Sequence, residues 1–161
     1  MRASHPPPPQ LALAPAAHAQ VTGTNNADVG YQKHMQTTAK EYTNGVLMVD
    51  NYLKNDSWWY GMRPQTVVVS VDNRGRAIWV SKVFQSATVC GVLDPTCASQ
   101  RRETFNDSRP AVIGQNTTRL DIFHADNPNY RNLRNDLIDV IKSGTDVAQA
   151  IKDAWAQLNK S

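Results

Sequence analysis

The sequence predicts an α+β domain in which helices cover an antiparallel sheet of about four strands. Apolar residues recur at helical spacing before residue 54 and after residue 127, and the stretch between them is rich in β-branched residues and turn signals. We therefore expect a long N-terminal helix, a run of strands, and a C-terminal two-helix hairpin packed on the sheet.

The first part of the chain differs from the rest. A proline run, Pro6–Pro9, precedes small apolar residues that end in Ala17-His18-Ala19, a pattern typical of the end of a secretory signal peptide. A flexible Pro/Ala leader is the alternative. We expect residues 1–19 to be such a segment and residues 20–161 to form a single domain that is secreted or periplasmic.

The helix is predicted from about Ala27 to Leu53, with Gly45 as its weak point. Its apolar residues follow steps of four and three and are Met35, Ala39, Tyr42, Val46, Val49 and Leu53. The stripe predicts packing on the core, and a coiled coil or partner-binding helix is the alternative.

A β-hairpin follows. Thr66–Val71 is dense in β-branched residues, which predicts a strand buried at least in part on both sides. Asp72-Asn73-Arg74-Gly75 has the composition of a tight turn, and the next run, Arg76 to Phe84 with an extension toward Val89, alternates apolar residues on two faces.

The remaining elements are shorter. Two strands are predicted at Ala111–Gly114 and Thr118–His124, after a polar, arginine-rich connection. The first helix of the C-terminal hairpin begins at Pro128 and ends at Gly144, and Thr145 caps the second.

Cys90 and Cys97 are the only cysteines and enclose six residues. This spacing fits neither a C-x-x-C redox motif nor a zinc site. It predicts a local disulfide, which agrees with an oxidising compartment, and two buried thiols are the alternative.

Composition and missing motifs exclude several classes of function. The chain is 40% apolar with a net charge of +3, which indicates a packed globule. No apolar run approaches the ~18 residues of a membrane span. No phosphate-loop, dinucleotide or metalloprotease motif is present, so we expect no cofactor or metal. The arginines lack an accompanying nucleic-acid motif, and nucleic acid is therefore not a favoured partner.

His124 and Asp126, with Asp121 three residues before His124, are weak catalytic candidates. Residues two apart on a strand point the same way, so His124 and Asp126 could orient one another or share a metal. In the alternative, Asp126 belongs to a helix start and His124 is an ordinary surface residue.

Trp58-Trp59-Tyr60 is the leading binding candidate. Alternate side chains of an extended segment point to opposite faces, so these three rings cannot all enter one core. Exposed aromatics are typical of sugar-stacking or protein-binding surfaces. Arg74 and Arg76, at the hairpin tip, are expected to receive an acidic partner. The alternatives are rings that wrap a helix end and arginines that are simply solvated.

The hairpin, Gly91-Val92-Leu93-Asp94, Arg109-Pro110-Ala111 and the last strand together resemble the periplasmic C-terminal domains of TonB and TolA proteins over roughly residues 64–124. The resemblance implies a periplasmic interaction domain and gives no residue a role.

The sequence as a whole predicts a secreted or periplasmic binding protein, such as an inhibitor or immunity-type partner, whose ligand is another protein or a carbohydrate. A small extracytoplasmic enzyme that uses His124 and Asp126 is the main alternative.

Overall fold

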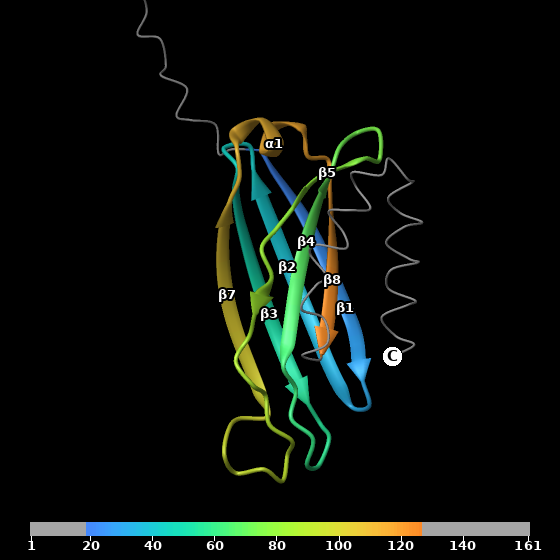
Figure 1. Cartoon of the computed structure of the whole chain (residues 1–161), viewed down its shortest axis with the longest axis vertical. Coiled ribbons are helices and arrows are strands. Elements are labelled where there is room, and N and C mark those ends of the chain that lie inside the picture. The colour runs from blue at the N-terminus through green and yellow to red at the C-terminus, as the bar shows by residue number, and fades with distance from the viewer. Residues whose placement is uncertain (1–18, 127–161) are drawn as a thin grey trace, which may run out of the picture.

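The computed structural model describes residues 19–126, which form a two-layer β-sandwich (Figure 1). The first sheet has the order β1 (Gln20–Gly30), β2 (Lys33–Tyr42), β3 (Val46–Asn55), β7 (Gln100–Ser108). In the second sheet, β4 (Pro64–Val71) pairs with β5 (Ala77–Val80), β6 (Phe84–Gln85) and β8 (Arg119–Asp126). All of these pairs are antiparallel, and one short helix, α1 (Ala111–Asn116), lies at one end.

The predicted α+β class and the predicted helix from Ala27 to Leu53 are therefore wrong. This segment forms most of an antiparallel meander, in which Ala27 pairs with Met35 and Met35 with Leu53. Steps of four residues are even, so they keep side chains on one face of a strand as well as on one face of a helix. Gly45, expected to be a weak point in the helix, lies in the turn between β2 and β3 with a φ of 89°.

Polar residues on the buried face hid the strand pattern of β2 and β3. Thr37 and Glu41 on β2 and Asn51 on β3 are all buried between the sheets. These positions would be apolar in a simple alternation, and their polarity removes the period of two that identifies a strand.

The predicted hairpin is confirmed. β4 is buried at every position, and its pairing with β5 places Val69 opposite Val80. Gly75 has a φ of 76° in the turn, a conformation that glycine adopts at little cost. The expected long second strand is divided into β5 and β6, which pair with different parts of β4.

Other predictions for short elements have mixed outcomes. The strand predicted at Thr118–His124 is confirmed as β8, whereas Ala111–Gly114 belongs to helix α1 and is not a strand. β7 occupies the stretch that was expected to be an arginine-rich connection. The predicted C-terminal helices lie outside the described residues.

Apolar side chains from both sheets fill the space between them. The central cluster joins Ala39, Leu47, Val49, Val68, Phe84, Leu120 and Ile122. A second cluster, near the end where β3 finishes, contains Met35, Leu53, Met62 and Val89. These two clusters hold the layers together along their length.

A buried polar cluster lies toward the opposite end of the core. The Arg109 guanidinium and the Glu41 carboxylate have no exposed side-chain surface, and their nearest atoms are 3.3 Å apart. Ser70 and Thr117 donate to Glu41 at 2.6 and 3.1 Å. Burial lowers the pKa of Arg109, and the charge of Glu41 opposes that shift.

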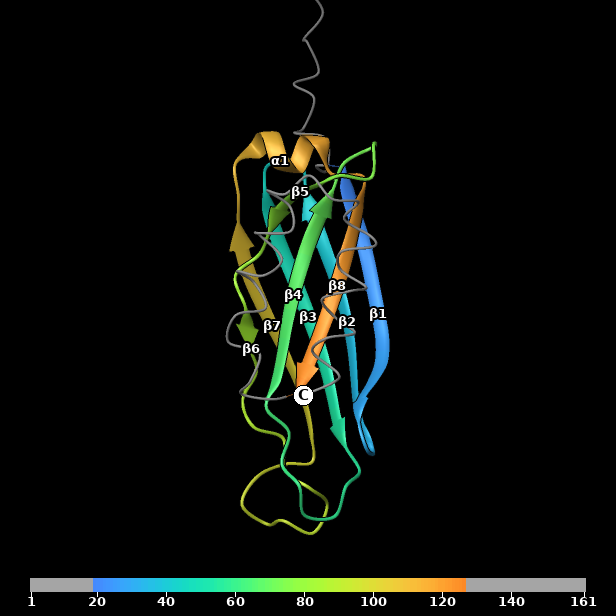
Figure 2. The same cartoon turned by 45° about the vertical axis from the view of Figure 1, so that its right-hand side comes forward.

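Hydrogen bonds from side chains join the two sheets along both long sides of the sandwich. On one side, β1 runs beside β8 (Figure 2), and the Asn25 side chain on β1 donates to the Ile122 carbonyl on β8 at 2.8 Å. On the other side, Glu103 of β7 accepts a bond from the Ala87 backbone N–H at 3.1 Å. No helix within residues 19–126 is long and apolar enough to cross a membrane.

Candidate functional site

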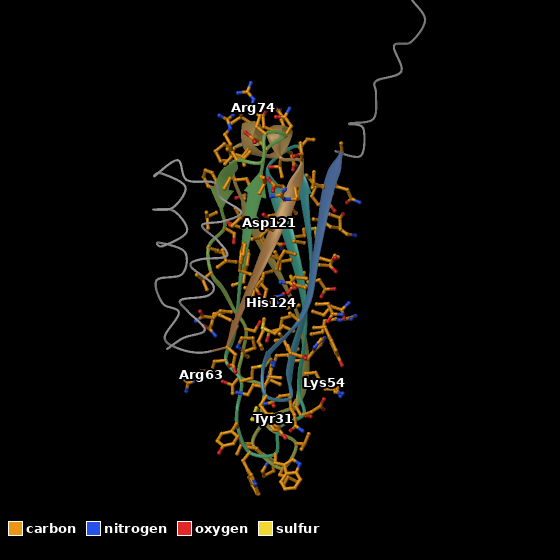
Figure 3. All side chains as sticks on the ribbon, turned by 90° about the vertical axis from the view of Figure 1, so that its right-hand side faces the viewer. Tyr31, Lys54, Arg63, Arg74, Asp121 and His124 are labelled. Carbon is orange, nitrogen blue, oxygen red and sulfur yellow. A yellow bond between two sulfur atoms is a disulfide. The ribbon has the colours of Figure 1, made fainter. Side chains whose placement is uncertain are left out.

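Solvent-exposed aromatic side chains cluster at the end of the sandwich where β3 ends and β4 begins (Figure 3). Tyr31 is 80% exposed, Trp58 66%, Trp59 65% and Tyr60 75%. Val92 and Leu93, in the disulfide loop, are about half exposed. We call these six residues the aromatic end: Tyr31, Trp58, Trp59, Tyr60, Val92 and Leu93.

A pocket opens between the β1–β2 turn, which carries Tyr31, and the β3–β4 loop, which carries Trp58–Tyr60. It has a volume of about 310 Å³ and is lined by Tyr31, Gln32, Ser57, Trp58, Trp59 and Tyr60. Concave sites of this size are typical of small-ligand binding or of a cavity that receives one side chain of a partner. The aromatic residues therefore form a shaped surface and not only an exposed patch.

Asn55 holds the loop of Trp58–Tyr60 from beneath. Its side chain is fully buried, and its amide donates to the carbonyls of Tyr60 at 2.6 Å and Val89 at 3.2 Å. Its oxygen accepts bonds from the Ser57 backbone N–H at 3.0 Å and the Ser57 hydroxyl at 2.6 Å. One buried side chain thus fixes both ends of the short segment that carries the exposed rings.

The disulfide loop packs against the same segment. The backbone N–H groups of Val92 and Leu93 donate to the carbonyls of Ser57 and Trp58 at 2.8 and 3.0 Å. A Cβ at Gly91 would lie 2.6 Å from the Trp58 carbonyl oxygen, so this close approach requires glycine.

Cys90 and Cys97 form the predicted disulfide, with their Cα atoms 5.4 Å apart. This distance lies in the ordinary range for a disulfide. The bridge closes the loop that presents Val92 and Leu93, and it adds a covalent support to the aromatic end.

The turn between β1 and β2 supplies the other wall of the pocket. Gln32 has a φ of 56°, a left-handed conformation that is uncommon for a residue other than glycine. Its carbonyl accepts a bond from the Asp56 backbone N–H at 2.8 Å, which joins the Tyr31 turn to the loop after β3.

Arg74 and Arg76 lie at the opposite end of the sandwich, in the turn between β4 and β5 (Figure 3). The Arg76 guanidinium pairs with Asp72 at 3.0 Å, and the Asp72 carboxylate also accepts the backbone N–H groups of Arg76 and Arg74. Those bonds, chiefly that from the Arg76 backbone, lower the pKa of Asp72. The structure therefore does not bring the two predicted binding groups together.

His124 lies between the sheets and not on the surface. It is 1% exposed, and its Nε2 is 2.6 Å from the Thr37 hydroxyl. That hydroxyl donates its single proton to Asn51, so Nε2 of His124 must carry the proton of the pair. Nδ1 has no hydrogen-bond partner among the described residues. Burial, with a smaller contribution from His34, lowers the pKa of His124 to about 4.

Asp126 and Asp121 have partners other than His124. Asp126 accepts the Lys33 ammonium and the Arg63 backbone N–H, both at 2.8 Å. Asp121 accepts the Arg119 guanidinium at 2.9 Å. Within residues 19–126, no group of three His, Cys, Asp or Glu side chains is placed to hold a metal ion. The three candidates are therefore held in structural contacts and do not form one site.

Sequence reasoning missed Asn55, Gln32 and the aromatic partner Tyr31. Gly30 before Tyr31 is a turn signal, but it fell inside the predicted helix and was not used. Neither the cysteine loop nor the TonB and TolA resemblance gives Val92 and Leu93 a binding role, because nothing local in the sequence indicates that this loop meets Trp58.

Comparison of the chain with protein-family models, with curated proteins and with solved structures gives no match. The resemblance to TonB and TolA domains thus gains no support, and function has to be argued from the geometry of the aromatic end.

Proposed function

We propose that this protein is a secreted or periplasmic binding protein that captures its ligand with the aromatic end. The observation that carries the proposal is a contrast within one loop. The rings of Trp58, Trp59 and Tyr60 are exposed to water, whereas Asn55 and Ser57 beneath them are buried and hydrogen-bonded.

Exposed rings on a fixed backbone suit binding for two reasons. Each ring removes a large apolar area from water when a ligand covers it, and Trp and Tyr are the residues most enriched at the energetic centres of interfaces. A loop that is already ordered also loses little conformational entropy on binding, so more of the contact energy appears as affinity.

Two features support export. The Cys90–Cys97 disulfide is of a kind that persists in oxidising compartments. Ala17-His18-Ala19 has the small-residue pattern that precedes a signal-peptidase cut.

A chain that begins at Gln20 should therefore melt at the same temperature as the full chain, and a large drop in melting temperature would show that residues 1–19 have a structural role.

The proposal is tested by comparing three forms of the full chain, each immobilised through its C-terminus. The forms are the wild type, the double variant Trp58→Ala/Trp59→Ala, and the control Arg74→Ala at the other end of the sandwich. Each is exposed to the exported fraction of the source organism, and the retained material is measured together with its protection of Trp58 and Trp59 from hydroxyl-radical oxidation.

We expect the wild type and Arg74→Ala to retain the same ligand and the double variant to lose it. Truncation of one anchor ring should cost about 2 kcal/mol or more of binding free energy. If Arg74→Ala loses the ligand and the double variant keeps it, the binding surface is the β4–β5 turn and the proposal is wrong.

A further inference from the structure

Among the residues that the structure describes, the lining of the aromatic pocket carries no charge. Its residues are two tyrosines, two tryptophans, one glutamine and one serine. The nearby carboxylate of Asp56 is paired with Lys54 at 3.1 Å. A ligand recognised by a carboxylate, a phosphate or an ammonium group would find no counter-charge in this pocket, so the lining favours a neutral ligand.

The same lining offers ring faces together with neutral hydrogen-bonding groups. The indoles of Trp58 and Trp59 each have one donor, the phenols of Tyr31 and Tyr60 can donate and accept, and the Gln32 amide does both. Within residues 19–126, none of these five side chains makes a hydrogen bond, and all five are exposed. These groups are therefore available to a ligand that has an apolar face and a polar rim.

Gln32 is an unexpected residue at its position. Its φ of 56° is a left-handed conformation that glycine adopts more readily than a residue with a side chain. The bond that this turn makes to Asp56 uses the backbone carbonyl of Gln32 and needs no side chain. A contact between the side-chain amide and a ligand accounts for a glutamine where the backbone favours glycine.

We infer that the pocket binds a neutral oligosaccharide, with a pyranose ring stacked on the aromatic rings and its hydroxyl groups bonded by Gln32 and the phenols. This inference rests on the proposed function. Pyranose rings with equatorial hydroxyls fit best, because their C–H bonds leave both faces apolar while the hydroxyls form a polar rim.

A protein partner is the competing ligand. Arginine accompanies Trp and Tyr at the centres of protein interfaces. Within residues 19–126 the pocket lining contains no arginine, and Arg74 and Arg76 lie at the other end of the sandwich. A pocket of about 310 Å³ also matches the lower limit of small-ligand sites, whereas a protein partner would need a wider surface.

The test is isothermal titration calorimetry of the full chain with three soluble probes. Cellohexaose and chitohexaose are neutral, with equatorial hydroxyls or acetamides, and hexagalacturonate is an acidic probe of the same length. The variants are Trp58→Ala, Trp59→Ala and Gln32→Gly, with Arg74→Ala as the control. Gln32→Gly removes the amide but keeps a residue suited to the turn, and thermal melting confirms that each variant is folded.

We expect at least one neutral hexasaccharide to bind with a Kd below about 1 mM and hexagalacturonate to bind more weakly. Loss of either indole should weaken binding by about tenfold or more, and Gln32→Gly by about threefold or more. Arg74→Ala should leave the Kd within about twofold of the wild type.

Three results would overturn the inference. They are no binding of either neutral probe, equal or tighter binding of hexagalacturonate, and neutral binding that the three pocket variants leave unchanged. If the first occurs while a captured protein still requires Trp58 and Trp59, the proposed function holds and only the ligand class is wrong. If neither sugar nor captured ligand depends on these rings, both proposals fail.

Discussion

Replacing Asn55 with aspartate tests whether the aromatic end is held from beneath. The change keeps the shape of the side chain and the oxygen that accepts the two bonds from Ser57. It replaces the amide, which donates to the Tyr60 and Val89 carbonyls, with a second oxygen. At neutral pH a buried carboxylate oxygen would then face two carbonyl oxygens, one of which was 2.6 Å from the amide nitrogen.

The expected cost follows from those two contacts. A buried donor or acceptor that loses its partner costs about 1 to 3 kcal/mol, and an uncompensated buried charge costs about 3 to 5 kcal/mol. We therefore expect Asn55→Asp to lower the free energy of unfolding by about 3 to 5 kcal/mol at pH 7. Asn106→Asp, the same change at an exposed position of β7, should alter it by less than about 0.5 kcal/mol.

The loss at Asn55 should also depend on pH with a definite sign. Burial and the facing carbonyls would raise the pKa of the new carboxyl group in the folded state above its unfolded value. A group whose pKa is raised on folding favours the folded state at low pH and opposes it as the pH rises through the folded pKa. The difference between variant and wild type should therefore shrink as the pH falls toward 4.

The measurement is urea unfolding, followed by tryptophan fluorescence at several pH values, with the disulfide intact. A loss at Asn55 no larger than that at Asn106, or a difference that does not change with pH, would refute the idea that this amide fixes the loop. In the binding assays, Asn55→Asp should weaken capture even though it leaves all four exposed rings in place.

Three further predictions concern other parts of the molecule. Because the pKa of His124 falls to about 4 in the folded state, the free energy of unfolding should drop by at most about 3 kcal/mol as the pH falls from 6.5 toward 4. His124→Gln should flatten this part of the plot of unfolding free energy against pH, as measured by urea unfolding. Arg109→Leu should cost about 3 to 5 kcal/mol in urea unfolding by leaving Glu41 unpaired in the core, and the double variant Arg109→Leu/Glu41→Leu should recover at least half of that loss. Thiol titration of protein from its native compartment, under denaturing and non-reducing conditions, should find no free thiol, because Cys90 and Cys97 are bridged. Two free thiols would contradict both the bridge and the export of the protein to an oxidising compartment.

The sequence predicted those parts of the fold whose buried faces are apolar. Thr66–Val71 and the Asp72–Gly75 turn predict a hairpin because a run of β-branched residues is followed directly by a block of turn residues. The sequence of β2 and β3 fits a helical pattern instead, because the core-facing residues Thr37, Glu41 and Asn51 are polar and interrupt the alternation of a strand. Their partners are contributed by β4, β8 and segments farther along the chain, so no local window shows that these polar residues are satisfied.

The candidate site was predicted only in part for a similar reason. Three adjacent aromatic residues predict from the sequence alone that the rings do not all enter one core, and in the structure all three are exposed. That Tyr31 and Leu93 lie beside Trp58 depends on two turns from distant parts of the chain, whose positions follow from the strand pairing. Arg74 and Arg76 could be placed in a turn from the sequence, but the end of the sandwich on which that turn lies could not.

The exposure of the aromatic rings follows from how the core is closed beneath them. Met62 and Val89 pair through both of their backbone groups, at 2.8 and 2.9 Å, and their side chains are fully buried with Met35 and Leu53. This cluster fills the end of the core, so an indole could enter it only by displacing side chains that are already close-packed.

The carbonyls of Ser57, Trp58 and Tyr60 all accept hydrogen bonds, so turning the loop inward would also break those bonds. Burial of one ring would yield about 1.5 to 3 kcal/mol, whereas two or more buried groups would lose their partners at about 1 to 3 kcal/mol each. Residues 19–126 therefore have no internal arrangement that covers these rings more favourably, and an external ligand can cover them without breaking any of these contacts.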